Sequence, residues 1–469
     1  MHKINNIKVL SLLIPIIVLF SSCKNEFKGY EYVAYFGGEI VNPNNRYVLF
    51  CKDNEVLDTL KLDKNNRFFI QFDSLKPGLY SFKHEPEYQY VYFDKNDSIM
   101  VRVNSKDFDG SVVFCGRGDQ KNNFLMEMFL KNEKDRNKMF EFFDDDFEDF
   151  SKEIDSTYAK AKKFYASKKE KIKWSDEFDV FANASVDFNY YSKKELYPIV
   201  HKIRTGQDMI ERLPADYYDY RKNINFNNVE LCNYAPYVMY LSHMLNNMGT
   251  INYHNHFSEK DLALKTNINK MTIADTLIKN EKVKNNILNN IAFTYLLEDQ
   301  NMANNNKFLE TYRKLSTDKS KKNEITTICN AIKMLEVGDT LPDVDLTDAN
   351  GTKISSASVC KPNTVFFFWT VNAKAHFEAV HKKVVALKAK FPQYNFVAVN
   401  INDSVEDWKK VLAAYKFENV TELHCSDFEN IKNKWAINKI HRTIVLNTKG
   451  TIKNAFSNIF DSQFEDNLK

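Results

Sequence analysis

The chain has 469 residues, of which 43% are hydrophobic and 27% are charged, so it has the composition of an ordered globular protein and the length of about three domains. Its formal net charge at pH 7 is only +3. This charge implies no large basic surface, so we do not expect nucleic acid as a partner.

The first 22 residues have the pattern of a secretory signal peptide. A basic start is followed by the apolar stretch Val9–Phe20, which is shorter than the roughly 20 residues that a spanning helix needs. The sequence FSSC then ends at Cys23 and resembles a bacterial lipobox, in which the cysteine is lipidated and becomes the new N-terminus. The alternative is a plain signal peptide with an incidental cysteine. We therefore predict a signal peptide at 1–22, a lipidated Cys23 and a tether at 23–29.

Six further cysteines are spread along the chain without any CxxC pair. Free cysteines commonly act as small core hydrophobes, and the sequence does not select disulfide partners among them. These cysteines are Cys51, Cys115, Cys232, Cys329, Cys360 and Cys425.

Residues 30–118 alternate short β-rich runs with turn sequences. Examples are RYVLFC at 46–51 and RFFIQF at 67–72, with turns such as NPNN and DKNN around them. Strands at intervals of roughly 8 to 12 residues predict a small antiparallel sandwich or barrel, and we take the β-sandwich as the prediction for 30–118. The runs contain no cluster of His, Asp, Glu or Cys, so this domain looks like a binding or packing module.

Residues 119–335 are rich in Lys, Asn, Glu, Phe and Tyr and poor in Gly and Pro, which predicts a helical region. In FEFFDDDFEDF, residues 140–150, the phenylalanines fall at helical spacing and the acids face the other way. A Ca²⁺ loop needs a glycine bend that is absent there, so we interpret the stretch as one amphipathic helix. The aromatic stretches 217–226 and 234–245 are interpreted as surfaces that pack helices together.

Residues 336–469 alternate strands and helices, which predicts an α/β domain with a mixed sheet. The central unit is VFFFWTVNAKAHFEAV, residues 365–380, a buried strand that leads directly into a helix. Further strands are expected at 396–402 and 423–427, with helices around Trp408 and near 431–437. A β-hairpin is expected at 442–456.

The order and spacing of VGDTLPDVDLTDANG, the FFFW strand, FVAVNINDSVEDWKK and IVLNTKGTI resemble the TlpA-like thioredoxin-fold proteins. These are membrane-anchored thiol-disulfide oxidoreductases of the bacterial envelope, and the resemblance covers about 130 residues. The preceding sandwich and helical region look like the N-terminal extension of lipoprotein members. The resemblance therefore implies a multidomain α+β protein with a C-terminal thioredoxin-like α/β domain.

The chain departs from this family at the redox site. Family members carry a WCxxC segment after the strand, but here Ala373 replaces the first cysteine and His376 the second. Ile440, His441 and Arg442 stand where the family has isoleucine, a cis-proline and a threonine or similar residue. A cis bond without proline costs about 3 kcal/mol. We expect no thiolate at the helix start and no resolving thiol.

We therefore predict a lipid-anchored envelope protein, facing the periplasm or the cell surface, whose thioredoxin-like domain is a binding or scaffolding module with no catalytic residues and no cofactor. Its expected partners are the membrane, through the lipid anchor, and an unknown envelope protein. The alternative is an oxidoreductase or peroxidase-like protein that uses Cys425 as a displaced thiol. A Cys-His hydrolase built on His424 lacks an evident orienting acid.

A weaker hypothesis is a Zn²⁺ or Cu²⁺ site shared by His376 and His441, with Cys425 or His381 as a third ligand. In a thioredoxin fold the cis-proline loop faces the CxxC turn, so these two imidazoles are expected to be neighbours. No ligand pair here has the short fixed spacing of a strong metal motif. We therefore expect no metal.

Overall fold

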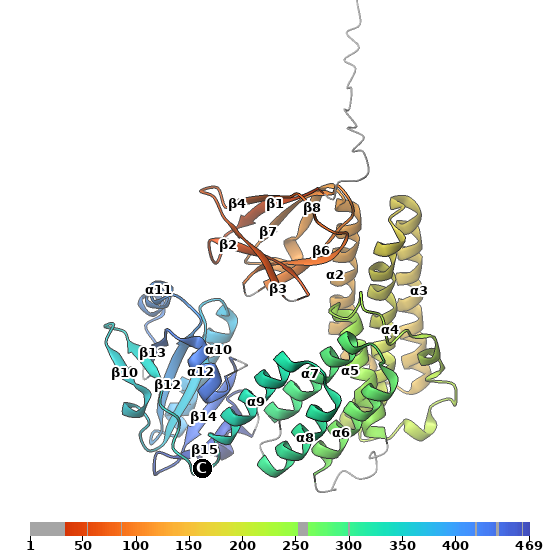
Figure 1. Cartoon of the computed structure of the whole chain (residues 1–469). Helices are drawn as coiled ribbons and strands as arrows, with labels where there is room; N and C mark the ends of the chain where they lie inside the picture. The colour runs from red at the N-terminus through yellow and green to blue at the C-terminus, as the bar shows by residue number, and fades with distance from the viewer. Residues whose placement is uncertain are drawn as a thin grey trace, which may run out of the picture.

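The computed structural model describes residues 33–53, 55–85, 87–251, 261–298, 301–417, 420–437, 440–461 and 463–469. The expected signal peptide, Cys23 and the tether at 23–29 lie outside these residues. Within the described part, no helix has the length and hydrophobicity to cross a membrane. The chain builds a β-sandwich, a helical region and an α/β domain in that order (Figure 1).

The sandwich consists of two four-stranded sheets, ordered β4-β1-β7-β8 and β3-β2-β5-β6. Its core is aromatic, because Phe36 of one sheet packs against Phe50 and Phe82 of the other at ring distances of 5.6 and 5.8 Å. The strands are β1 Ala34–Val41, β2 Tyr47–Lys52, β3 Glu55–Lys61, β4 Arg67–Phe72, β5 Gly78–His84, β6 Glu87–Phe93, β7 Ser98–Asn104 and β8 Val113–Arg117.

One pairing in the sandwich differs from the antiparallel expectation. Strands β1 and β7 run parallel, with Tyr35 paired to Ser98 and Val41 to Asn104. Parallel neighbours need a long crossover connection, and here the intervening chain forms the whole second sheet and strand β4 of the first before it returns. The alternation of side chains along one strand does not predict whether a strand distant in sequence pairs with it in parallel or antiparallel.

The helical region follows the sandwich directly. Its N-terminal helix α2 lies beside the sandwich, and α9 lies beside the α/β domain (Figure 1). The helices are α2 Asp119–Phe142, α3 Phe147–Ile172, α4 Asp176–Thr205, α5 Ala235–Thr250, α6 Leu262–Leu277, α7 Glu281–Glu298, α8 Met302–Leu315 and α9 Lys319–Lys333, with a short α1 at Phe108–Ser111 and 3-10 turns at Ile210–Arg212 and Asp219–Asn223.

The prediction of one continuous helix over 140–150 is wrong. Helix α2 ends at Phe142 and α3 begins at Phe147, with a turn between them. Phe143 and Phe150 are nevertheless both buried, and Phe150 stacks on Tyr197 of α4 at 3.9 Å. The run of aspartates favours a turn and a helix start, since Asp is preferred at both. Phe143 from the turn and Phe150 from α3 therefore belong to one core.

The aromatic stretch 217–226 also packs against helices, as expected, but it is not α-helical itself. It contains the 3-10 turn, from which Tyr220 stacks on Tyr191 of α4 at 4.6 Å. The stretch 234–245 forms most of α5.

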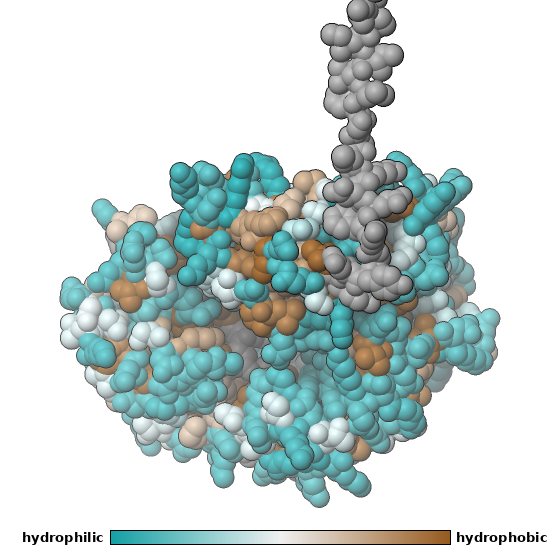
Figure 2. All heavy atoms as spheres, turned by 45° about the horizontal axis from the view of Figure 1, so that its top comes forward, coloured by the Kyte–Doolittle hydropathy of each residue, from teal (hydrophilic) through white to brown (hydrophobic). Residues whose placement is uncertain are grey.

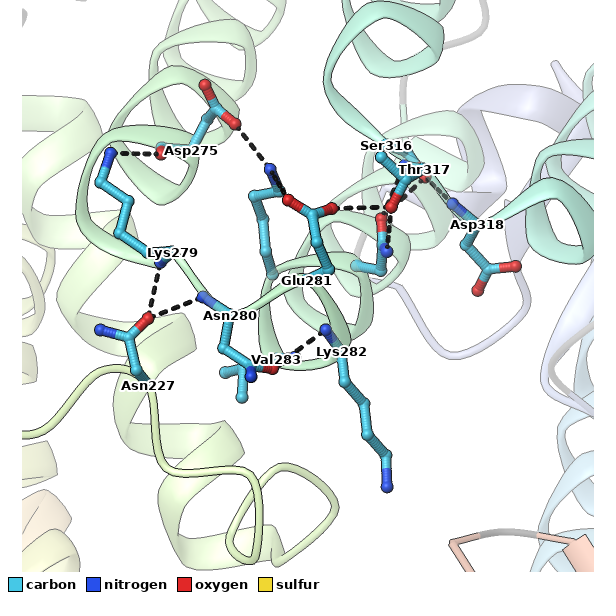
Figure 3. Close-up of polar contacts among 12 residues, drawn as sticks. Asn227, Asp275, Lys279, Asn280, Glu281, Lys282, Val283, Ser316, Thr317 and Asp318 are labelled. Carbon is cyan, nitrogen blue, oxygen red and sulfur yellow. Dashed lines mark hydrogen bonds and ion pairs between the residues drawn. The ribbon is translucent and has the colours of Figure 1, made fainter.

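The junction between α6 and α7 is held by asparagine side chains (Figure 3). The Asn227 side-chain oxygen accepts hydrogen bonds from the backbone N–H groups of Lys279 and Asn280 at 2.6 and 2.8 Å. Asn280 caps α7 by accepting from two N–H groups of its first turn at 3.1 and 3.2 Å. The Thr317 hydroxyl donates to Glu281 at 2.7 Å. These bonds tie the start of α7 to the segment that precedes α5 and to the connection between α8 and α9.

Ion pairs join the sandwich to the helical region at two places. Lys282 of α7 and the Asn233 amide both contact the Asp53 carboxylate, at 2.8 and 3.0 Å. Lys121 of α2 reaches Asp97 in the β6–β7 turn at 2.6 Å, and both side chains are buried. Buried charges require partners, so this pair fixes how α2 sits against the sandwich.

The C-terminal domain is a seven-stranded sheet ordered β10-β9-β13-β12-β11-β14-β15. Strands β11, β12 and β13 are parallel, and the outer strands are antiparallel to their neighbours. The elements are β9 Asp345–Asp348, β10 Lys353–Ser355, β11 Thr364–Trp369, α10 Lys374–Lys390, β12 Asn395–Ile401, α11 Val405–Tyr415, β13 Thr421–Cys425, α12 Phe428–Trp435, β14 Arg442–Leu446 and β15 Ile452–Asn458, with 3-10 turns at Ser356–Ser358 and Phe464–Leu468.

Helices cover both faces of this sheet, as the sequence predicts. Phe377 of α10 and Trp408 of α11 share a core with one face. Trp435 of α12 packs on the other face, against Phe366 of β11, and belongs to the same core as Ile325 of α9. The α/β domain therefore shares a hydrophobic core with the helical region. The face shown in Figure 2 is largely hydrophilic, with hydrophobic residues gathered near its centre.

Candidate functional site

The connection from β11 to α10 has the strand-turn-helix geometry expected from the sequence. Trp369 ends β11 and is fully buried, with its ring 5.5 Å from the rings of Phe377 and His381. Ala373 occupies the N-cap position of α10, and His376 lies in the first turn. Sequence resemblance and structure therefore place the same two residues at the helix start.

The turn itself is held by Asp403, which follows β12. Its carboxylate accepts hydrogen bonds from the Val371 backbone N–H at 2.6 Å, the Thr370 hydroxyl at 2.8 Å and the side-chain amides of Asn400 and Asn372 at 2.7 and 3.2 Å. Burial raises the pKa of Asp403, and these hydrogen bonds only partly oppose it. The Asp403 carboxylate therefore lies against the turn and is hydrogen-bonded to it.

His376 has no hydrogen-bond partner among the residues that the structure describes. Both ring nitrogens are buried and unpaired, and the ring meets Phe460 edge-on at 5.8 Å. Burial lowers the pKa of His376 to about 4, with smaller contributions from His441 and His381. A neutral imidazole at neutral pH brings no positive charge to the helix start.

The two candidate third ligands for a metal are engaged elsewhere. His381 bonds through one nitrogen to the Phe377 carbonyl at 2.7 Å and through the other to Glu422 at 2.9 Å, and its ring stacks on Phe417 at 3.6 Å. The Cys425 thiol donates to the Asp427 carbonyl at 3.2 Å. Across the described residues, no three His, Cys, Asp or Glu side chains group as metal ligands. The zinc or copper hypothesis therefore has no ligand set in this part of the chain.

The thiols of this domain are poorly suited to nucleophilic chemistry. Cys425 is only 3% exposed, and burial raises the pKa of its thiol to about 11. Burial likewise raises the pKa of Cys360 to about 12. Both side chains are therefore protonated at neutral pH, whereas a redox nucleophile must be a thiolate. Cys115, in the sandwich, is exposed, and all six cysteines in the described residues are free.

Two polar residues of this region, Asp403 and Glu422, were not singled out from the sequence, and Arg442 was named there only for its place in the family pattern. Asp403 and Glu422 each act through partners distant in sequence, and Glu422 also accepts from the Trp369 indole at 3.2 Å. Arg442 donates to the Ala455 carbonyl at 2.8 and 3.0 Å and lies 4.0 Å over the Phe456 ring. Burial lowers the pKa of Arg442 to about 9, which leaves it charged at neutral pH. Arg442 thus fastens the start of β14 to β15.

A family model described as thioredoxin-like matches residues 363–452, which include the β11–α10 turn. Among solved structures, a candidate thiol-disulfide oxidoreductase from Bacteroides vulgatus is similar, with 21% identity over 29% of this chain and 99% of its own, and a TM-score of 0.26. A thioredoxin-like protein from Bacteroides caccae has 17% identity over 54% of this chain and 89% of its own, with a TM-score of 0.33. No curated protein matches the chain. The fold that the sequence predicts for the C-terminal region is thus confirmed by the family model.

Proposed function

From a thioredoxin-like domain that has alanine and histidine in place of two cysteines, we propose a lipid-anchored cell-envelope protein in which this domain binds or scaffolds an envelope protein and exchanges no disulfides. The protein faces the periplasm or the cell surface. The observation that carries the proposal is Ala373 at the N-cap of α10, where the exchange reaction requires a thiolate.

Thiol-disulfide exchange proceeds by attack of a thiolate on a disulfide sulfur, and a second thiol then resolves the mixed disulfide. Ala373 has no sulfur to attack with. His376 has none to resolve with, and its buried neutral ring also provides no charge that would stabilise a neighbouring thiolate. Neither half of the reaction has a group to perform it.

The geometry of the turn is suited to recognition. The Asp403 network holds residues 370–372 in one conformation, and a preorganised surface loses less entropy on binding. Asn372 and Lys374 are exposed beside it, and Phe460, in contact with the His376 ring, is 43% exposed. A partner that docks at this edge of the sheet meets two polar groups and one aromatic ring.

The enzyme alternative relies on Cys425, and the environment of this thiol argues against it. A raised pKa keeps the sulfur protonated, and near-complete burial blocks a disulfide substrate from reaching it. No second cysteine follows it at the spacing of a resolving thiol.

Thiol alkylation tests the two functions on the native protein. With N-ethylmaleimide at pH 7 and peptide mass spectrometry, exposed Cys115 should react first and serve as an internal control. Cys425 should react only after unfolding in urea, and Cys360, which is partly exposed but has a raised pKa, should react more slowly than Cys115. If Cys425 is alkylated as fast as Cys115, its thiol is accessible and reactive. That result would contradict the binding or scaffolding role and favour an oxidoreductase that uses Cys425.

Anchoring is tested separately at Cys23. A lipoprotein cysteine carries two acyl chains in the bilayer, which is the minimum for stable attachment. Cys23→Ala should therefore release the protein from membranes or stall its processing, while Cys115→Ala should leave fractionation unchanged. A Cys23→Ala protein that is cleaved normally and stays with membranes at the wild-type level contradicts the lipid anchor.

A further inference from the structure

A cavity of about 250 Å³ lies where the sandwich meets the helical region, far along the chain from the thioredoxin-like domain. Strand β6 and helices α2, α4 and α5 each supply part of its wall. The wall is mainly apolar and aromatic, and its apolar side chains include Tyr88, Tyr90, Leu125, Met126, Phe129, Phe188, Tyr234 and Met239.

Three of these apolar side chains remain open to solvent. Tyr88 is 46% exposed, Phe129 37% and Met239 45%. They come from β6, α2 and α5, so they surround the cavity from different elements rather than following one strand or helix. Grouped exposed apolar side chains that line a concave site are a signature of ligand recognition.

The polar groups of the cavity carry an excess of negative charge. Glu87, Asp109 and Glu133 line it, against one cation, Arg136. Arg136 is 3.9 Å from Glu133. Among the described residues, the Asp109 carboxylate accepts a hydrogen bond only from the neutral Gln89 amide, at 2.9 Å. The Glu87 side chain makes no hydrogen bond or ion pair with any residue that the structure describes. Two carboxylates therefore lack a positive partner.

These two carboxylates also oppose each other electrostatically. Burial raises the pKa of Glu87, and the negative charge of Asp109 raises it further. A cation placed between them removes this repulsion, since opposite charges at short distance favour the ionised carboxylates. An anionic ligand would add to the repulsion between the two carboxylates.

We propose that this cavity is a binding site for a small amphipathic cation, that is, an ammonium or guanidinium group on an aromatic or aliphatic body. The cationic group lies between Glu87 and Asp109, and the body lies among Tyr88, Phe129 and Met239. This site is separate from the thioredoxin-like domain, and it adds a small-molecule ligand to a protein otherwise proposed to bind a protein partner.

Three probes with one hydrophobic body and different charges test the proposal: 4-phenylbutylamine, 4-phenylbutanol and 4-phenylbutyrate. Titration of the full chain in detergent, followed by calorimetry and by NMR saturation transfer, should show the amine binding about tenfold more tightly than the alcohol, and the acid more weakly still. Equal affinities for all three, or no amine binding at millimolar concentration, overturn the proposal.

Variants locate the binding. Glu87→Gln combined with Asp109→Asn should weaken amine binding about tenfold and leave the alcohol unchanged, whereas Glu170→Gln, an exposed residue of α3 outside the cavity, should change neither. Ser192→Phe, which adds bulk to the cavity wall, should weaken both ligands, with circular dichroism as the folding control. If amine binding survives both Ser192→Phe and the double variant, it occurs elsewhere and the assignment is wrong.

Discussion

Asp403→Ala removes the carboxylate that holds the β11–α10 turn. The substitution deprives the Val371 N–H, the Thr370 hydroxyl and two asparagine amides of their acceptor. A hydrogen-bond donor left without an acceptor in a buried site costs about 1–3 kcal/mol. Three of the four donors are part-buried and one is exposed, so we take about 1 kcal/mol for each of the three. The expected loss of unfolding free energy is about 3 kcal/mol.

Urea unfolding followed by tryptophan fluorescence measures this loss. Three of the four tryptophans lie in the α/β domain, so a Trp174→Phe background confines the signal to that domain. Asp466→Ala, which removes an exposed carboxylate paired only to Lys469, is the matched control and should change stability by at most about 0.5 kcal/mol. A loss below about 1 kcal/mol for Asp403→Ala would refute the view that this network holds the turn.

The pH dependence of the same network has a defined sign. The pKa of Asp403 is raised in the folded protein above its ordinary value of 3.8, so between these two values the folded state binds more protons than the unfolded state. Its contribution to stability is present below pH 3.8 and is lost as pH rises through the folded pKa. Asp403→Asn should abolish this loss, so wild type should lose stability relative to the variant as pH rises from 3.8.

Further substitutions test other parts of the structure by the same unfolding measurement. Lys121→Met leaves Asp97 and Asp94 facing each other and should cost about 3–5 kcal/mol; a cost under 1 kcal/mol would exclude a structural role for the pair. Asn280→Ala removes the cap of α7 and should cost about 1 kcal/mol, with no change contradicting the capping role. His376→Phe should be neutral or stabilising at pH 7, because the imidazole has no partner. Since the folded pKa of His376 is about 4, wild type should lose stability as pH falls from 6.5 toward 4 and the variant should not lose that part.

Much of the fold follows from local patterns. The FFFW strand and the helix after it are recognisable because the hydrophobic period changes from a continuous buried run to 3.6 residues at one point. The β14–β15 hairpin is likewise predicted from Lys449 and Gly450 at its turn. Gly450 adopts a positive φ of 77° there. Such signals depend on neighbours in sequence and need no tertiary information.

Two parts of the fold differ from what the local patterns predict. The helical spacing of phenylalanines continues across Asp144–Asp146, but these aspartates favour a turn, and the aromatic rings on either side of it still share a core with Tyr197 from α4. The parallel pairing of β1 with β7 depends on a crossover of five strands.

The candidate site divides in the same way. The loss of both cysteines is visible in the sequence at Ala373 and His376. Two other features are not visible in the sequence, because each joins residues on separate elements. These are the hydrogen bonds of Asp403 to the turn and the pairing of Glu422 with His381.

Insulin reduction by dithiothreitol tests the central claim most directly. Wild-type protein should not accelerate the reaction above buffer, because Ala373 supplies no thiolate at the start of α10. Ala373→Cys combined with His376→Cys, which restores both sulfurs at the helix start, should accelerate it and so show that the assay detects this fold. A wild-type rate above buffer that disappears with Cys425→Ser would contradict the account.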